Sequence, residues 1–394
     1  MKKRHALFLC HRVPYPPDKG DKIRSWRVLQ SMAARYKVHL VSFLDDVHDV
    51  RYKNELQDLC ASVQLVQLKK GRARVRAIAR HLEGRSASFG YFFDQRIDSA
   101  VRKARQNKLA VEVAFSSSMA PYIAHHVGDA IRIIDFCDAD SAKWHEYSVS
   151  ATFPLRRILA REACAVAREE TEIRSWADHT FAITPAEAAL FPQQPELRPV
   201  DWWSNGVDAD YFSPGPMLAG PFSSDAVFIG AMDYRANIQA VEHFTKDIWP
   251  RIRKAKPNAV FSVVGRNPAR RIKKLDGRHG VRVIGRVEDV RPWLIGARVS
   301  VAPLQVARGL QNKVLEAMAM AKPVVASPEV AVGIRCAPEG ELVIAQSPDQ
   351  WTDAILSLLN YQDRANKIGE AARRRMVTDY QWDSSIKRFT NHLP

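Results

Sequence analysis

Asn312, Lys313 and Glu316 lie in a segment of the chain whose pattern predicts a helix. Lys313 and Glu316 are three residues apart, so they share one face of that helix, with Asn312 at its edge. The opposite, buried side is expected to consist of Leu315, Met318 and Ala319. A lysine can bind a phosphate, and a carboxylate can accept hydrogen bonds from two neighbouring hydroxyls. A phosphate with a vicinal diol describes a nucleotide. The alternative is a surface helix with an ion pair, and the spacing alone supports both equally.

Arg308 and Gly309 lie where this helix is expected to begin and belong to the same candidate site. A glycine lets the backbone approach a ligand closely. The first N–H groups of a helix have no partner within the helix, so a helix start readily binds an anion. We therefore expect Gly309 and the N–H groups that follow it to face a phosphate, with the Arg308 guanidinium nearby.

Three further glycines, Gly230, Gly265 and Gly285, each follow an apolar segment that predicts a strand. The carboxyl ends of parallel strands meet at one edge of their sheet, where ligands of such folds bind. The repetition at equivalent positions indicates a binding rim, although each glycine alone is weak support. The chain that leaves these strands supplies the other candidate residues, which are Met232, Asn237, Arg266, Arg286 and Val287.

A polar loop follows the first predicted strand and carries Asp18, Lys19, Gly20, Asp21 and Arg24. Several prolines exclude a helix there, and Gly20 permits an unusual turn just before the next helix. The loop lacks the glycine and lysine spacing of a P-loop. We predict that this rigid loop lines a site, and the alternative is a proline-stiffened surface connection.

Asp135 and Asp138 stand at the end of another predicted strand, at 131–136. Asp140 or Ser141 can cap the helix that follows, but capping does not account for all three acids. Both Asp135 and Asp138 are therefore candidates for the same rim of the first sheet. The neighbouring histidines at 125 and 126 have no acids at ligand spacing and do not indicate a metal site.

Short apolar strands alternate with amphipathic helices along the whole chain, which predicts an α/β fold with two Rossmann-like, doubly wound parallel sheets. The strands are expected at 6–10, 38–43, 63–68, 111–115, 131–136, 179–183, 200–203, 226–229, 260–264, 281–284, 299–303, 323–326 and 342–344. Proline and glycine concentrate in 204–221, which is typical of a linker. We predict domains at 1–204 and 223–376, a linker at 205–222 and a last segment at 377–394. The candidate residues then line a cleft between the two domains.

The composition favours anionic partners. The 394 residues include 59 lysines and arginines against 43 acids, a net charge of +16. Nucleotides or an acidic membrane face would match this charge, and no nucleic-acid-binding motif accompanies it. Five scattered cysteines suit a reducing compartment and argue against zinc. With no signal-peptide core and no run of about 20 apolar residues, we expect a cytosolic protein without a metal, at most peripheral to a membrane.

Residues 69–85 are the densest basic segment and carry an apolar stripe of Val75, Ile78, Ala79 and Leu82. The stripe with its arginines suits an anionic bilayer. Packing of the stripe on the sheet, with the arginines solvated, is the alternative that the pattern favours. The helix predicted at 156–176 alternates arginines with glutamates, and we expect it to present a solvated face with i, i+4 ion pairs.

These residues resemble those of retaining glycosyltransferases of family 4, which have the GT-B fold, and the resemblance covers essentially the whole chain. Within that family the sequence is most similar to sugar transferases associated with exopolysaccharide and PEP-CTERM export systems. The stretches that carry the resemblance are 11–25, 134–144, 204–212, 228–237, 285–287 and 308–334.

The resemblance implies a nucleotide-sugar donor in the C-terminal domain. Glu316 would bind the ribose hydroxyls, Arg286 and Val287 would lie by the base, and Lys313 and Arg266 would hold phosphate. The N-terminal domain, including the loop around Gly20, would bind the acceptor. The last helix, expected at 380–393, would return to that domain, with Trp382 and Phe389 as its anchors.

Arg308 departs from the family pattern, because it stands eight positions before Glu316, where the family usually has a glutamate. It would contact a diphosphate or a charged sugar. Transfer would then need no metal, because the helix start, Lys313 and an arginine stabilise the departing diphosphate. The departing phosphate would accept the acceptor proton, and Asp18, Asp135 or Asp138 is the alternative acceptor of that proton. Two other functions stay open: a non-catalytic nucleotide-sugar-binding protein and a nucleotide-sugar epimerase.

Overall fold

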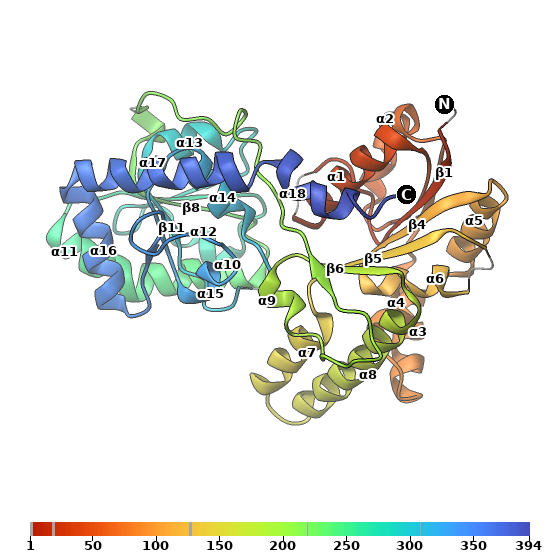
Figure 1. Cartoon of the computed structure of the whole chain (residues 1–394). Coiled ribbons are helices and arrows are strands. Elements are labelled where there is room, and N and C mark those ends of the chain that lie inside the picture. The colour runs from red at the N-terminus through yellow and green to blue at the C-terminus, as the bar shows by residue number, and fades with distance from the viewer. Residues whose placement is uncertain (1–2, 18–19, 126–127, 219, 308) are drawn as a thin grey trace. The chain divides into compact units, whose positions relative to one another are not determined.

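The chain folds into two compact units, each built on a parallel sheet (Figure 1). This computed structural model describes residues 3–17, 20–125, 128–218, 220–307 and 309–394. Unit 1 comprises Met1–Ser204 with Ile386–Pro394, and unit 2 comprises Asn205–Ser385. The predicted α/β class with two parallel sheets is confirmed.

Unit 1 contains a seven-stranded sheet in the order β3-β2-β1-β4-β5-β6-β7, and all neighbours run parallel. The strands are β1 His5–Cys10, β2 Lys37–Leu44, β3 Ser62–Gln67, β4 Leu109–Phe115, β5 Ile131–Cys137, β6 His179–Ala182 and β7 Asp201–Trp202. Nearly continuous apolar runs such as that of β1 are typical of strands covered on both faces. In the register of the central strands, Ala6 lies opposite Val38 on one side and Val111 on the other.

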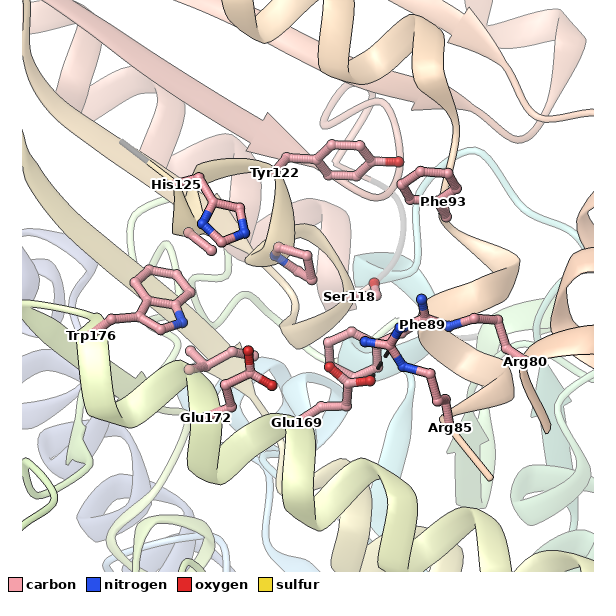
Figure 2. A pocket seen from close by; sticks show the side chains of 13 residues that line it. Arg80, Arg85, Phe89, Phe93, Ser118, Tyr122, His125, Glu169, Glu172 and Trp176 are labelled. Atoms are coloured by element: carbon pink, nitrogen blue, oxygen red, sulfur yellow. Dashed lines mark hydrogen bonds and ion pairs between the residues drawn. The ribbon is translucent and has the colours of Figure 1, made fainter. Parts of the chain in front are cut away.

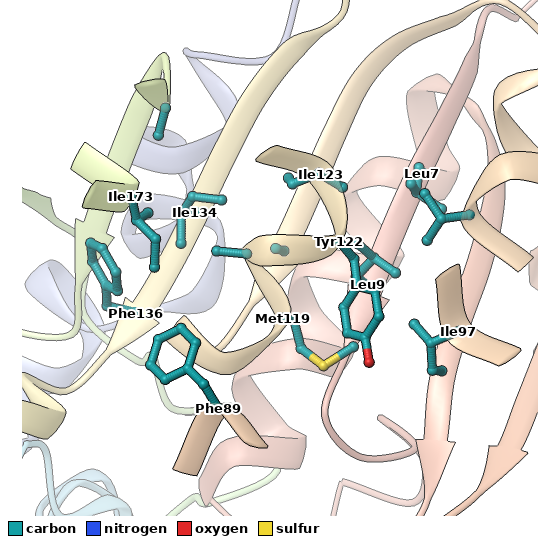
Figure 3. Packing of buried hydrophobic residues seen from close by; sticks show 14 of the residues in the cluster. Leu7, Leu9, Phe89, Ile97, Met119, Tyr122, Ile123, Ile134, Phe136 and Ile173 are labelled. Atoms are coloured by element: carbon teal, nitrogen blue, oxygen red, sulfur yellow. The ribbon is translucent and has the colours of Figure 1, made fainter. Parts of the chain in front are cut away.

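Helices cover this sheet and enclose its core. They are α1 Gly20–Arg35, α2 Lys53–Leu59, α3 Lys70–Leu82, α4 Ala87–Tyr91, α5 Gln95–Arg105, α6 Pro121–Ala124, α7 Asp140–Val149, α8 Leu155–Trp176 and α9 Pro185–Ala188, with 3₁₀ turns η1 Val47–Tyr52 and η2 Ser117–Met119. Figure 3 shows Leu7 and Leu9 of β1 and Ile134 and Phe136 of β5 packed with side chains of the covering helices, such as Ile97. Burial of these apolar side chains between the sheet and its covering helices therefore stabilises the sheet.

Unit 2 contains a six-stranded parallel sheet in the order β10-β9-β8-β11-β12-β13. The strands are β8 Ser224–Ile229, β9 Phe261–Val264, β10 Val281–Gly285, β11 Ala297–Ala302, β12 Val324–Ala326 and β13 Val343–Ile344. The helices are α10 Arg235–His243, α11 Trp249–Ala255, α12 Arg270–Lys273, α13 Arg291–Ile295, α14 Asn312–Ala319, α15 Pro328–Ala331, α16 Pro348–Asn360, α17 Gln362–Asp379 and α18 Trp382–Thr390, with the short turns η3 Gly220–Phe222 and η4 Phe244–Ile248. The order places β8, β9 and β10 side by side.

The last helix, α18, begins in unit 2, and its residues from Ile386 onward count with unit 1. Phe389 is fully buried, with its ring centroid 5.7 Å from those of both Phe181 and Trp203. Arg35 Nη1 donates to the Thr390 carbonyl over 2.9 Å. The end of the chain thus completes the core of unit 1 beside β6 and β7.

The expectation of a solvated charged face on α8 is wrong for three of its residues. Glu162 is buried and accepts hydrogen bonds from the first turn of α4. Glu170 is buried and accepts from the Ser141 amide and hydroxyl at the start of α7. Arg174 is buried and donates to main-chain carbonyls of residues 192 and 198. These long side chains tie neighbouring segments to α8, because each satisfies main-chain groups that would otherwise be unpaired.

The preference for packing the α3 stripe on the sheet is also wrong. Val75, Ile78 and Leu82 are 68%, 61% and 74% exposed. Ala73 is the residue of α3 that packs inward. Within the part of the chain that the structure describes, no helix is both long and apolar enough to span a bilayer.

Candidate functional site

The carboxyl ends of β8, β9 and β10 form the predicted glycine rim in unit 2. The Gly230 amide donates to the Val264 carbonyl over 3.0 Å, and the Gly265 amide donates to the Gly285 carbonyl over 2.9 Å. A Cβ atom on Gly265 would lie 1.7 Å from the Gly230 carbonyl oxygen. Gly285 has a φ of +80°, which a side chain disfavours. The strand ends therefore approach one another as closely as only glycine permits.

Lys313 of α14 reaches across this rim. Its Nζ donates to Asn237 Oδ1 over 2.6 Å and lies 4.5 Å from the centroid of the Phe228 ring. Asn237 is buried in α10, and its Nδ2 donates to the Ala231 carbonyl over 3.0 Å. Side chains of β8, α10 and α14 thus fix the ammonium group. The sequence predicted Lys313 and Asn237 at one rim but did not predict the hydrogen bond between them.

Glu316 lies on the same face of α14, one turn beyond Lys313. Its carboxylate makes no hydrogen bond or ion pair with any described residue, so the alternative of a simple Lys313–Glu316 surface ion pair does not hold there. Burial raises the pKa of Glu316 to about 7, and Lys313 offsets part of that increase. Burial likewise lowers the pKa of Lys313 to about 7, opposed by Glu316. A ligand with anionic and hydroxyl groups would give both side chains partners that stabilise their charged forms.

The start of α14 lies three residues later than the sequence suggested, at Asn312 rather than at Gly309. Gln311, the N-cap residue, makes no capping hydrogen bond with its side chain. Asn312 Oδ1 accepts a hydrogen bond from the buried Asn205 Nδ2 over 3.0 Å. Gly309 has a φ of +60°, and a Cβ on Gly333 would lie 2.4 Å from its carbonyl oxygen. Asn205, which lies outside the helix, therefore anchors the start of α14. The side chain of the N-cap residue does not cap the first turn.

The other donor-side candidates differ in exposure. Met232 is fully buried, and its amide donates to the Arg266 carbonyl over 2.9 Å. It therefore links the segments that follow β8 and β9. Arg266 and Val287 are half-buried, and Arg286 is exposed. Arg308 lies outside the described residues.

Gly230→Ala is expected to weaken this arrangement without unfolding the unit. The new Cβ would lie 2.8 Å from Asn237 Nδ2 and 3.3 Å from Lys313 Nζ, so both side chains must shift. Overpacking of this kind costs about 1–3 kcal/mol. Thermal unfolding of the variant measures that loss, and a nucleotide titration should show weaker binding than in the wild type. Unchanged nucleotide affinity would mean that the Asn237–Lys313 contact is not part of the site.

Asp135 and Arg24, two candidates in unit 1, are fully buried and bind each other. Arg24 Nε donates to Asp135 Oδ2 over 2.9 Å and Arg24 Nη2 to Asp135 Oδ1 over 3.1 Å. The Trp203 indole N–H donates to the same carboxylate over 3.0 Å, and the guanidinium lies 3.5 Å from the centroid of the Trp203 ring. With both oxygens occupied, this carboxylate is placed to hold β5 and α1 together rather than to contact a ligand.

Asp138 differs from Asp135, because its carboxylate makes no hydrogen bond or ion pair with the described residues and is half-buried at the end of β5. Burial raises its pKa to about 7, and the nearby carboxylates of Glu187 and Asp140 add to the increase. A carboxyl group with such a pKa can take up or release a proton near neutral pH. Asp138 is therefore the acid of the first sheet that is best suited to proton transfer.

The loop before α1 is described only in part, since Asp18 and Lys19 lie outside the described residues. Gly20 begins α1 and is exposed. Asp21 accepts from Arg12 Nη1 over 2.9 Å and lies 3.4 Å from His11 Nε2. Burial alone would raise the pKa of Asp21, but these two neighbours hold it below its ordinary value. His11 and Arg12 were missed as candidates, although they lie in the same polar loop.

A pocket of about 160 Å³ opens in unit 1 away from all the predicted site residues. Figure 2 shows Glu169, Glu172 and Trp176 of α8 along one side and Arg80 and Arg85 opposite the glutamates. Arg80 Nη2 lies 3.3 Å from Glu169 Oε1, so part of the charge is neutralised within the wall. The pocket's mixed charges give it no clear ligand. Among the described residues, no group of three or more histidines, cysteines or acids is placed to hold a metal.

Comparison with known proteins finds a family-model match within unit 2. Residues 223–361 match the family model described as glycosyl transferases group 1. The match contains the glycine rim, Lys313 and Glu316. A search of curated protein sequences found no match to this chain.

Solved structures similar to the chain cover both units. HepE from Anabaena, in complex with UDP, has a TM-score of 0.70 at 13% identity, covering 100% of this chain and 99% of HepE. Sucrose-phosphate synthase from Thermosynechococcus elongatus has a TM-score of 0.71 at 16% identity, covering 99% of this chain and 98% of the synthase. The chain has the GT-B fold. WaaG, a glycosyltransferase involved in lipopolysaccharide biosynthesis, has a TM-score of 0.63 at 15% identity, covering 98% of this chain and 99% of WaaG.

Proposed function

We propose that the protein is a glycosyltransferase that moves a sugar from a nucleotide-sugar donor to a surface-glycan acceptor. The observation that carries this proposal is the anchored Lys313 beside Glu316 on α14, next to the glycine-bearing strand ends, with no hydrogen-bond partner for the Glu316 carboxylate among the described residues. Glu316 would accept hydrogen bonds from the ribose hydroxyls. Lys313 and the first N–H groups of α14 would face the diphosphate.

The remaining donor-side residues would complete the same site. Arg286 and Val287 would lie beside the base, and Arg266 and Arg308 would add positive charge near the diphosphate. Gly309 would let the main chain approach the phosphate closely.

The reaction would need little from the protein beyond stabilising charge. The bond between the anomeric carbon and the diphosphate oxygen breaks, and the negative charge that builds on that oxygen is stabilised by Lys313 and the helix start. The acceptor oxygen forms the new bond on the same face of the sugar, which retains the configuration. Its proton passes to the departing phosphate, with Asp138 as the alternative proton acceptor. No step requires a metal.

Structures of HepE with UDP and with UDP-glucose make uridine nucleotides the first donors to test. We propose a glycan or lipid-linked acceptor in exopolysaccharide or related surface-glycan assembly, because WaaG acts in lipopolysaccharide biosynthesis and the sequence resembles exopolysaccharide transferases. Such an acceptor would be met at the cytoplasmic face of the plasma membrane.

The decisive experiment combines nucleotide binding with product detection. A panel of sugar nucleotides is titrated against the wild type and Glu316→Gln, and acceptor glycosylation is followed by mass spectrometry. Removing a hydrogen-bond acceptor that binds ribose should weaken binding by about 1.5–3 kcal/mol, or on the order of 10–150-fold. Glu329→Gln on α15 serves as the matched control and should bind like the wild type.

The outcomes separate the candidate functions. Nucleotide binding with no transfer to any acceptor would favour a non-catalytic binding protein. Conversion of the donor to another sugar nucleotide without an acceptor would favour an epimerase. Wild-type affinity and turnover in Glu316→Gln would overturn the assignment of the site itself.

A further inference from the structure

Unit 1 exposes two apolar groups on neighbouring helices. The first consists of Val75, Ile78 and Leu82 along α3, which follow one another at helical spacing and share one stripe. The second lies where α7 gives way to α8, and it consists of Val149, Phe153, Leu155 and Ile158, with Phe153 73% exposed. Single exposed apolar side chains are common on proteins, but here seven of them gather on neighbouring elements.

Two hydrogen bonds join α8 to the end of α3, where the first group ends. Arg161 of α8 donates from Nη2 to the Leu82 carbonyl over 3.3 Å, and Arg168 Nη2 donates to the Gly84 carbonyl over 2.6 Å. Ile158 and Leu155 precede Arg161 by three and six residues, so they lie about 4.5 Å and about 9 Å along α8 from the residue that bonds to the end of α3. Figure 1 shows α3 and α8 close together in unit 1. We call these seven residues the α3–α8 surface.

Basic residues predominate around the α3–α8 surface, although Glu83 and Glu146 are exposed at its edges. Residues 69–82 contain six lysines and arginines and no acid, and residues 150–161 contain three arginines and no acid. Arg72, Arg74, Arg156 and Arg157 are exposed. The Arg157 guanidinium lies 5.3 Å from the centroid of the Phe153 ring, so the positive charge reaches the apolar tip itself.

We propose that the α3–α8 surface docks the protein on an anionic lipid bilayer. Apolar side chains enter the boundary between headgroups and acyl chains, while the surrounding arginines bind lipid phosphates. An apolar stripe flanked by basic residues matches both the apolar acyl chains and the anionic headgroups of such a membrane. A nucleic acid would match the arginines but not Phe153 or Leu82, and a second protein copy would bring the same positive charge. The proposal does not depend on the donor site, because all seven residues belong to unit 1.

Vesicle flotation tests the proposal on the full chain. Vesicles of phosphatidylglycerol and phosphatidylcholine should carry the protein, vesicles of phosphatidylcholine alone should carry much less, and salt should weaken the binding. The triple variant Val75→Gln, Ile78→Gln, Leu82→Gln should reduce partition by roughly 100-fold, because three side chains no longer leave water. Phe153→Ser with Leu155→Gln should reduce it by about tenfold or more. Val377→Gln on α17, an exposed apolar residue of unit 2, is the matched control and should change nothing.

The replaced side chains are exposed, so all variants are expected to fold, and an unchanged thermal unfolding curve verifies this. Cys164 of α8 is the exposed cysteine of the five, and an environment-sensitive dye on its thiol should shift to the blue on anionic vesicles. Three results would overturn the proposal: equal binding to neutral vesicles, wild-type binding by the triple variant, or loss of self-association in that variant with no vesicle binding by the wild type. Preferential binding to duplex DNA over anionic vesicles would also overturn it.

Discussion

Asp135→Asn is expected to destabilise unit 1 by about 3–5 kcal/mol, because it leaves the Arg24 guanidinium charged, fully buried and without its carboxylate. The Trp203 indole N–H would lose a charged acceptor as well. Hydrogen exchange followed by mass spectrometry measures the loss locally, since peptides of β5 and α1 should exchange faster while those of unit 2 stay protected. This readout suits a chain of two units, whose unfolding need not be two-state.

Two controls separate burial from charge. Asp98→Asn breaks the exposed i, i+4 pair with Arg102 and should cost about 0.5 kcal/mol or less. The double variant Arg24→Gln with Asp135→Asn should cost less than the sum of the single variants, because no charge is left unpaired. If Asp135→Asn keeps wild-type protection but loses sugar transfer, the carboxylate acts on the substrate and our structural interpretation is wrong.

Lys313→Met is expected to weaken nucleotide binding by about 1.5–3 kcal/mol and to change its dependence on pH. The pKa of Lys313 in the ligand-free protein is about 7, so above that pH its neutral amine must take up a proton when a diphosphate binds. Wild-type affinity should therefore fall as pH rises above 7, by up to about tenfold per pH unit. The pKa of Glu316 is also about 7, so affinity should fall again below that pH as its carboxylate becomes protonated. Calorimetric titrations with UDP across the pH range should give a maximum near 7.

The two limbs of this profile can be removed separately. Lys313→Met should abolish the alkaline limb and Glu316→Gln the acid limb, whereas Lys367→Met on α17 should leave both unchanged. For Lys313, the stability of the ligand-free protein changes with pH in the direction opposite to that of nucleotide affinity. Between about pH 7 and 10.5 the unfolded chain binds the lysine proton and the folded chain does not, so this lysine makes stability rise with pH in that window. A flat binding profile in the wild type would contradict the assigned roles.

The strands could be predicted because each is a short apolar run between glycine, proline or polar residues. β8 and β9, for example, lie where the alternation placed them, at 224–229 and 261–264. The common face of Lys313 and Glu316 could be predicted as well, since helix geometry fixes residues three apart. Asn237, the partner of Lys313, could not be paired from the sequence, because the two are 76 residues apart and meet only through the order of the strands.

Other features escape sequence reasoning for physical reasons. The sequence does not show whether an arginine and an aspartate face water or each other. It therefore could not distinguish the buried Arg24–Asp135 pair from residues of a ligand site. The stripe on α3 has the same spacing whether a sheet or a lipid covers it, and only the exposure of Ile78 and Leu82 separates the two. The glutamates of α8 looked solvated because the segments whose main chain they bind lie elsewhere in the sequence.

The return of α18 has a consequence for synthesis of the protein. Unit 1 needs Ile386–Pro394, which leave the ribosome after the whole of unit 2. Until then Phe181 and Trp203 lack the ring of Phe389 that packs on them. Domains usually fold in the order in which they are made. Here the unit made first is finished last, so the nascent chain carries an incompletely covered apolar core for the time that unit 2 takes to be translated.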